Sequence, residues 1–307
     1  MDLKKIRKIK KIFGKDTIAL FYRSLGFLSD KAFIKLIYKL RMGKKLNLEN
    51  PQTFTEKLQW LKLYDHNPEH TRMADKLQMR DFVKEKIGEG YTAPLIGVYD
   101  KWEDIDFAKL PNCFVIKTTH DSGSYVIVKD KAKLDIKEAK KRITHSLKKN
   151  YYKTTREWQY KNIKPKILIE EYLKDPVAQN SAVQNLTDYK FFCFNGKCKF
   201  LYIMQETSSK PTQVILDTKF NRMPFRMDDE PSKEMPKKPT EFDQMIEFAE
   251  KLSQDEAFLR VDMYLVGGKI YIGELTFYHF GGYIPFDPPE WDLKLGKKIK
   301  LKVGENQ

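Results

Sequence analysis

Two glycine-containing dipeptides constrain the fold of this chain more than any other feature, because each separates two β-rich runs. The dipeptides are Asn195-Gly196 and Gly267-Gly268. Each supplies the positive φ angles that a two-residue hairpin turn requires. The runs that they join span residues 189–194, 198–204, 258–265 and 269–275. We therefore expect two antiparallel hairpins in the second half of the chain.

The other patterns mix strand and helix. Apolar runs over residues 113–117, 125–129 and 167–173 are typical of strands, whereas residues 136–149 and 241–253 favour helices. Hairpins with interspersed helices predict an α+β architecture.

Two helices are expected before residue 90. Thr53 and Glu56 have the spacing of a capping box, which predicts a helix through Leu63. A second helix is expected over residues 73–87, where Gly88 ends it.

The chain is strongly basic. Its 307 residues include 57 lysines and arginines against 42 aspartates and glutamates, a net charge of +15. Such an excess attracts phosphates, nucleic acid, anionic lipid or acidic polysaccharide, and charge alone does not choose among them.

The cysteines and the apolar runs indicate a cytoplasmic protein. Cys113, Cys193 and Cys198 are odd in number and lack the spacing of a metal or redox site. No apolar run approaches the roughly 20 residues that cross a bilayer, and the N-terminus lacks the apolar core of a secretory signal.

The N-terminal segment reads as a basic amphipathic helix. Over residues 1–12, apolar residues recur every third position between lysines and an arginine, and a second apolar-rich stretch covers residues 17–40. Such a helix can dock on its own domain, or it can contact a membrane surface or an acidic polymer. The sequence leaves both interpretations open.

The most informative polar residues lie in the last predicted hairpin. Alternation places Arg260 and Asp262 on one face of their strand, and Glu274 and Thr276 on one face of the next. Carboxylate and hydroxyl oxygens suit Mg²⁺, which commonly shares its ligands with nucleotide phosphates. A neighbouring arginine can contact a phosphoryl group in transfer.

Upstream segments offer groups for a nucleotide. Lys117 ends an apolar strand, and Ser122-Gly123-Ser124 forms a small turn whose N–H groups could cover phosphates. The turn is neither a Walker A loop nor a dinucleotide fingerprint. Glu170-Glu171-Tyr172 ends the 167–173 strand and could meet an adenine edge, and Lys190 could reach a phosphate.

In this order the segments resemble the ATP-grasp superfamily. The phrases TFTEKLQWLKLYD, REWQYKNIKPKILIEEYL, DYKFFCFNGK, RVDMY and GELTF resemble its TupA-like family, of the teichuronopeptide-biosynthesis type, over about residues 48–296. The resemblance implies two α+β lobes that clasp ATP. The expected divisions are a basic helical extension over 1–50, an N-terminal lobe over 51–112, a central subdomain over 113–175 and a C-terminal lobe over 176–307.

The resemblance also implies a reaction and its partners. An ATP-dependent carboxylate–amine ligase would form an amide through an acylphosphate, with ATP and two Mg²⁺ ions as cofactors. The partners would be an acidic sugar or polysaccharide precursor and an amine or amino acid, with no nucleic acid. The protein would act in the cytoplasm in surface-polysaccharide or capsule assembly, with peripheral membrane contact open for residues 1–12.

Roles at the nucleotide follow from the matched motifs. Lys117, and Lys76 in the preceding helix, resemble the nucleotide-binding lysines. The residues implied for the phosphate loop, the adenine hinge and the ribose are Ser122, Gly123, Ser124, Glu170, Glu171, Tyr172 and Asp175.

Roles in the chemistry follow in the same way. Lys190 would contact the triphosphate, Arg260 would stabilise the transferred phosphate, and Asp262 and Glu274 would hold magnesium. Thr276 would be a third metal ligand where the superfamily commonly has Asn. Gly281 and Gly282 would offer backbone N–H groups to the tetrahedral oxyanion, whereas His120 and His279 lie nearby without an assigned role.

Three competing interpretations remain. His66 and His70 flank Pro68 in an inverted zinc-protease string, but proline disrupts a helix interior, so we expect an ordinary loop. Asp104 and Asp106 offer the Asp-x-Asp of a glycosyltransferase, although no apolar strand precedes them. A non-enzymatic protein that binds polysaccharide or membrane would rest on charge and the N-terminal helix alone.

Overall fold

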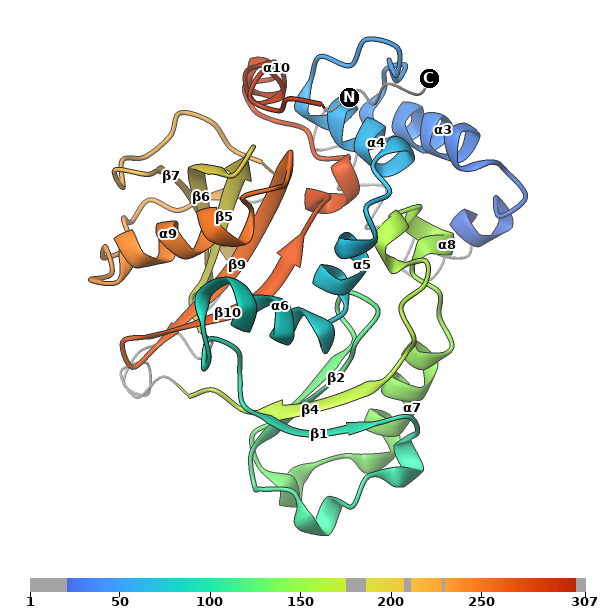
Figure 1. Cartoon of the computed structure of the whole chain (residues 1–307), viewed down its shortest axis with the longest axis vertical. Coiled ribbons are helices and arrows are strands. Elements are labelled where there is room, and N and C mark those ends of the chain that lie inside the picture. Colours follow the sequence, from blue (N-terminus) through green and yellow to red (C-terminus); the bar gives the residue numbers. More distant parts are fainter. Residues whose placement is uncertain (1–20, 175–185, 207–210, 228–229, 302–307) are drawn as a thin grey trace.

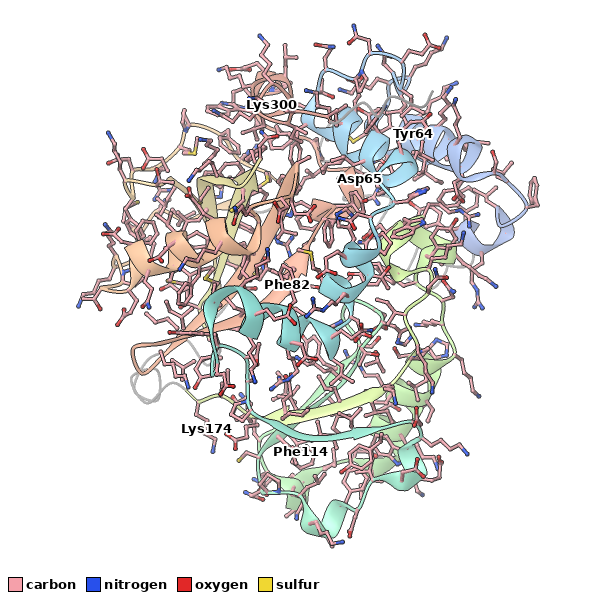
Figure 2. The ribbon with its side chains drawn as sticks, in the orientation of Figure 1. Tyr64, Asp65, Phe82, Phe114, Lys174 and Lys300 are labelled. Carbon is pink, nitrogen blue, oxygen red and sulfur yellow. The ribbon has the colours of Figure 1, made fainter. Side chains whose placement is uncertain are left out.

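The computed structural model describes residues 21–174, 186–206, 211–227 and 230–301. Two sheets, one of four strands and one of six, lie in separate parts of the molecule with helices around and between them (Figure 1). Each sheet has its own hydrophobic core, marked in Figure 2 by Phe114 for the smaller and Phe82 for the larger. The predicted α+β class is confirmed.

The four-stranded sheet has the order β1-β4-β2-β3 and is antiparallel throughout. Its strands are β1 (Leu95–Tyr99), β2 (Phe114–Thr118), β3 (Tyr125–Val128) and β4 (Ile167–Glu171). Helix α7 (Ile136–Leu147) packs on β2 and buries Ala139 and Ile143. The predicted strands are present, whereas β1 carries too weak an alternation to have been foreseen.

The six-stranded sheet has the order β10-β9-β5-β6-β7-β8. Its strands are β5 (Asp188–Phe194), β6 (Lys197–Glu206), β7 (Pro211–Asp217), β8 (Glu230–Pro231), β9 (Phe258–Val266) and β10 (Lys269–Thr276). Helix α9 (Phe242–Leu252) packs on β5, β6 and β9. Both predicted turns are confirmed, since Asn195, Gly196, Gly267 and Gly268 all have positive φ.

Helix α4 (Phe54–Tyr64) begins with the predicted capping box between Thr53 and Glu56. Its first turn is also held by Asp292 of α10 (Glu290–Gly296), which accepts from the Thr55 N–H at 2.9 Å and from its hydroxyl at 2.8 Å. Helix α3 (Asp30–Met42) packs nearby through the Tyr38 hydroxyl, 2.9 Å from that of Thr55. The N-terminal extension is thus joined to the body of the molecule.

The helix predicted over residues 73–87 is in fact two helices, α5 (Pro68–Ala74) and α6 (Gln78–Ile87). Asp75 interrupts them, because its carboxylate accepts from the Leu77 N–H at 2.9 Å and from the Gln78 side chain at 3.0 Å. An aspartate that bonds to the backbone two residues on favours a turn over a helix. Lys76 therefore lies in the break between helices.

The prediction of a loop around Pro68 is also wrong, because Pro68 is the first residue of α5, a position where a proline is tolerated. The two histidines of the zinc-protease string contact different residues. His66 stacks on Trp158, and His70 pairs with Glu256 at 2.8 Å beside Asp65.

Short helices complete the fold: η1 (Trp102–Asp104), η2 (Phe107–Lys109), η3 (Lys131–Lys133), α8 (Tyr152–Thr155), η4 (Trp158–Tyr160) and η6 (His279–Gly282). Among the residues that the structure describes, no helix is both long and apolar enough to cross a membrane. The predicted amphipathic helix over residues 1–12 lies outside them.

Candidate active site

The centre of the site is built by paired strands β9 and β10. Asp262 lies opposite Glu274 and Arg260 opposite Thr276 across the ladder. A bulge at Gly273 reverses the alternation of β10, so that Leu275 continues the buried face and Glu274 turns to the site. The prediction that Glu274 and Thr276 share a face holds, but the bulge that aims them was not visible in the sequence.

Arg260 is the hub of this centre. Its guanidinium grips both Asp262 oxygens, with Nε 2.6 Å from Oδ1 and Nη2 2.7 Å from Oδ2. It also donates to the Thr276 hydroxyl at 3.0 Å and lies 3.8 Å from the Glu274 carboxylate. Such a two-pronged pair fixes the plane of the arginine.

Lys190 reaches the same carboxylate from β5. Its Nζ lies 2.8 Å from Asp262 Oδ2 and also pairs with Asp188. Burial would raise the pKa of Asp262, but Arg260 and Lys190 together hold that pKa below its ordinary value. Burial and the Asp262 charge raise the pKa of Asp188 to about 6.

His279 is a site residue for which the sequence suggested no role. Its Nδ1 accepts from Arg260 Nη1 at 2.7 Å, so in the neutral ring Nε2 carries the proton. Burial and the charges of Arg260 and Lys190 hold its pKa well below the ordinary value. That buried Nε2 has no hydrogen-bond partner in the described part of the chain.

Lys76 lies between the two sheets. Its N–H donates to the Thr119 carbonyl at 3.1 Å, and its ammonium donates to the Asp121 carbonyl. Burial lowers the pKa of Lys76, while the charge of Glu274 opposes the shift and that of Lys117 adds to it. The charges that act on the Lys76 ammonium therefore come from both lobes.

Lys117 is held by an acid of the same sheet. Its Nζ lies 2.6 Å from Glu170 Oε2, and Arg80 Nη1 lies 3.1 Å from the other oxygen. The Glu170 carboxylate is thus engaged within the protein. At the predicted hinge, the Glu171 N–H donates to the Pro94 carbonyl at 2.9 Å, whereas Asp175 lies outside the described residues.

The predicted phosphate loop is organised by Asp121, which the sequence analysis did not assign. This buried carboxylate accepts from Thr118 and Ser146 hydroxyls at 2.6 Å each, and from Ser124. Gly123 has a φ of 85° at the tip. His120 serves the scaffold, because its Nε2 donates to the carbonyls of Ser146 and Lys149 at 3.2 and 3.0 Å.

The turn around the glycine pair is tied to α4. Gln59 donates to the carbonyls of Gly281 and Gly282 at 3.0 and 2.8 Å, and Lys62 Nζ donates to the Gly281 carbonyl at 2.6 Å. The Gly281 N–H donates to the Tyr278 carbonyl at 2.7 Å. That N–H is already engaged, and the oxyanion role of the glycine pair stays a prediction.

A cavity of about 410 Å³ unites part of these groups. Lys190, Arg260, Glu274 and Thr276 line it from the six-stranded sheet, and Ser122 lines it from the phosphate loop. Lys76 and Lys117 are not among its walls. Of the predicted site residues, the structure brings Lys190, Arg260, Glu274 and Thr276 closest together.

The oxygen donors of this centre fit a hard divalent cation. Glu274 and Thr276 line the cavity on the strand beside Asp262, whose two oxygens are paired with Arg260 and Lys190. The buried Asp188 Oδ1 has no hydrogen-bond partner in the described part of the chain. Carboxylate and hydroxyl oxygens are the ligands that Mg²⁺ prefers.

An antiparallel sheet of four strands and a mixed sheet of six thus build one site, with Lys190, Arg260 and Glu274 from the larger sheet and Ser122 from the loop of the smaller sheet at a shared cavity. The chain belongs to the TupA-like ATP-grasp family, whose family model matches residues 56–300. No curated protein matches the chain significantly.

Solved structures similar to this chain include ligases and a synthetase. D-alanine–D-alanine ligase from Bacillus anthracis is 19% identical over 66% of this chain and 56% of its own, with a TM-score of 0.38. N5-carboxyaminoimidazole ribonucleotide synthetase, in an ADP complex, is 16% identical over 73% and 51%, with a TM-score of 0.42. The chain spans about half the length of these proteins.

Proposed function

We propose that this protein is an ATP-dependent carboxylate–amine ligase. A substrate carboxylate would attack the γ-phosphate of ATP to give an acylphosphate and ADP. An amine would then attack the acyl carbon and release phosphate, leaving an amide. This sequence needs no nucleophilic side chain, so the task of the protein is to position the reactants and to neutralise their charge.

The observation that supports this proposal most is that Lys190, Arg260 and Glu274 come from three strands to line one cavity, with Asp262 paired to Arg260 and Lys190 beside it. Two cations offset the repulsion between a carboxylate and a triphosphate, the main electrostatic barrier of this step. Asp262, Glu274 and Thr276 would hold the two magnesium ions. Bound there, magnesium would neutralise charge on the phosphate oxygens.

The nucleotide would extend toward the smaller sheet. We propose contacts from Lys76 and Lys117 to its phosphates, cover from Ser122, Gly123 and Ser124, and adenine binding along Glu170, Glu171 and Tyr172. The buried anchor of the covering loop, Asp121, supports this arrangement because it holds the loop base while the Gly123 tip stays open.

The substrate class comes from the family. We propose that the carboxylate belongs to a uronic acid of a surface polysaccharide or its precursor, and that the reaction takes place in the cytoplasm. The glycosyltransferase alternative is disfavoured because Asp104 and Asp106 are exposed on the surface of short helical turns.

An ADP-release screen of uronic acids against amines tests the reaction. In that assay Glu274→Gln should lower turnover by two orders of magnitude or more, because it removes a charge from the metal site. Glu103→Gln, an exposed acid of the smaller lobe, is the matched control. Near-normal ADP release by Glu274→Gln would contradict the proposed metal site.

A further inference from the structure

The cavity extends beyond the phosphoryl-transfer centre. Its second half is walled by Phe33, Ile37 and Arg41 of α3, by Lys62 of α4, and by Glu157 after α8. Figure 1 shows α8 beside α3, where Tyr152 donates to Asp30. The N-terminal extension therefore contributes a wall of the candidate active site.

Glu157 is an acid in this wall that forms no ion pair with the residues that the structure describes. Its side chain is buried and accepts from Gln159 at 3.3 Å. Within the described ranges, no lysine or arginine nitrogen lies within 4.0 Å of it. Burial raises its pKa to about 7 although the charge of Lys62 opposes the shift. An unpaired buried carboxylate is unfavourable unless a ligand compensates it.

The charge of Lys62 compensates Glu157 only in part and from more than 4.0 Å away, because the Lys62 ammonium is engaged elsewhere. It donates to the Gly281 carbonyl at 2.6 Å and lies over the rings of Tyr283 and Tyr278, 4.6 and 5.5 Å from their centroids. Its contacts fix the wall of the cavity.

Arg41 and Tyr283 offer hydrogen-bond donors, a guanidinium and a hydroxyl, in the same half of the cavity. The Arg41 guanidinium lies 5.0 Å from the centroid of the Tyr283 ring and has no carboxylate within 4.0 Å among described residues. Tyr283 is 6% exposed, and its hydroxyl has no hydrogen-bond partner among those residues. Arg41, Glu157 and Tyr283 all line the same cavity.

We propose that this half of the cavity binds the amine substrate as a zwitterion, with its ammonium at Glu157 and its carboxylate at Arg41 and the Tyr283 hydroxyl. The inference rests on the proposed ligase function and names the class of amine, one that also carries a carboxylate. The opposite assignment is disfavoured, because Glu157 would repel the carboxylate that must be phosphorylated.

The assignment also gives Glu157 a catalytic task. An ammonium has no lone pair, so it must lose one proton before it attacks the acylphosphate, and the Glu157 carboxylate takes that proton. Attack forms the carbon–nitrogen bond. The carbon–oxygen bond to phosphate then breaks, and the second nitrogen proton leaves with the phosphate.

Binding of the twenty amino acids to the Mg-ADP-saturated protein, measured by calorimetry beside the corresponding carboxamides, tests the pocket. At least one amino acid should bind, and its carboxamide should bind more weakly. Arg41→Ala should weaken the amino acid by about 10- to 100-fold, the usual worth of a charge-assisted hydrogen bond. Lys39→Ala, an exposed position on the same helix, should leave binding unchanged.

Outcomes of the binding experiment separate the two proposals. If ADP binds but no amino acid does, or if Arg41→Ala binds as wild type does, the zwitterion pocket is wrong and the ligase proposal stands. If the wild type binds neither ADP nor ATP in the presence of magnesium, the ligase proposal itself fails.

Hydroxylamine tests the role of Glu157, since it is uncharged at neutral pH and needs no proton acceptor before attack. With glucuronate as the carboxylate, Glu157→Gln should lower the ratio of amide to hydroxamate by about 100-fold or more. Glu138→Gln, an exposed acid on α7, is the control. An equal loss of both products would overturn the proton-accepting role, and no hydroxamate from the wild type would count against the ligase proposal.

Discussion

Buried charged side chains in this protein have two different kinds of surroundings. Arg260, Lys190 and Asp262 neutralise one another within hydrogen-bond distance. Glu157 is similarly buried, and its carboxylate accepts a hydrogen bond from the Gln159 amide but has no ion pair within the described part of the chain. A charge without an ion-pair partner costs folding free energy, which sites of binding and catalysis commonly tolerate.

The pH dependence of the free energy of unfolding should reveal the raised pKa of Glu157. Its pKa of about 7 lies above the ordinary value of 4.5, so the folded state binds more protons than the unfolded state between these values. Wild-type stability should therefore fall relative to Glu157→Gln as pH rises from 5 to 7, by about 1–3 kcal/mol. The charged groups that act on this carboxyl are Lys62, Glu274 and Arg260.

Chemical denaturation at pH 5, 6 and 7 measures this difference. The variant should match the wild type at pH 5 and exceed it at pH 7. Glu138→Gln should show no such trend, because that acid is exposed. A constant difference across the window would contradict the raised pKa.

At the scale of elements, strand β10 shows how one residue redirects a surface. Gly273 forms a bulge opposite Asp262 and Met263, and a Cβ there would come within 2.7 Å of the Tyr264 ring. The absence of a side chain lets the strand shift by one residue while the core stays filled by Ile272 and Leu275. Glu274 is aimed at the cavity as a result.

Gly273→Ala should therefore harm both stability and activity. Its methyl group would push Tyr264 or straighten the bulge, at a cost of about 1–3 kcal/mol, and it would displace Glu274 from the proposed metal site. Urea unfolding and ADP release measure the two effects. Tyr264→Ala combined with Gly273→Ala should recover part of both losses, and a double variant no better than Gly273→Ala would contradict the steric account.

At the scale of the whole molecule, the candidate site depends on two sheets with separate cores. The charges of Glu274 in one lobe and of Lys117 in the other both act on the Lys76 ammonium. A nucleotide bound between them would connect the lobes by contacts that the free protein lacks.

MgATP at about 100 times its dissociation constant should raise the free energy of unfolding by about 2.7 kcal/mol. At the same concentration Lys76→Ala should gain clearly less, because it lacks a phosphate contact. Thermal unfolding with and without MgATP measures both, and Lys84→Ala, an exposed lysine of α6, is the control. Equal stabilisation of Lys76→Ala and wild type would argue against a role for Lys76 in nucleotide binding.

The sequence alone determined the features that depend on neighbours along the chain. Hairpin turns, the strands beside them and the capping box at Thr53 follow from positive-φ residues, alternation and local hydrogen bonds, whereas β1, β7 and β8 were not predicted. The Arg260-to-Thr276 cluster was accessible for the same reason, since its two strands form one hairpin. Asp75, whose local turn splits a helix, shows that even short-range signals can be missed.

Only the tertiary structure decided which distant residues meet. Lys190 pairs with Asp262 because β5 lies beside β9, 72 positions away along the chain. The same is true of Arg41, Glu157, His279 and Tyr283, which local patterns did not distinguish from ordinary helix and loop residues. Their significance comes from burial, charge and unmatched polar atoms, and these quantities exist only once the lobes have packed.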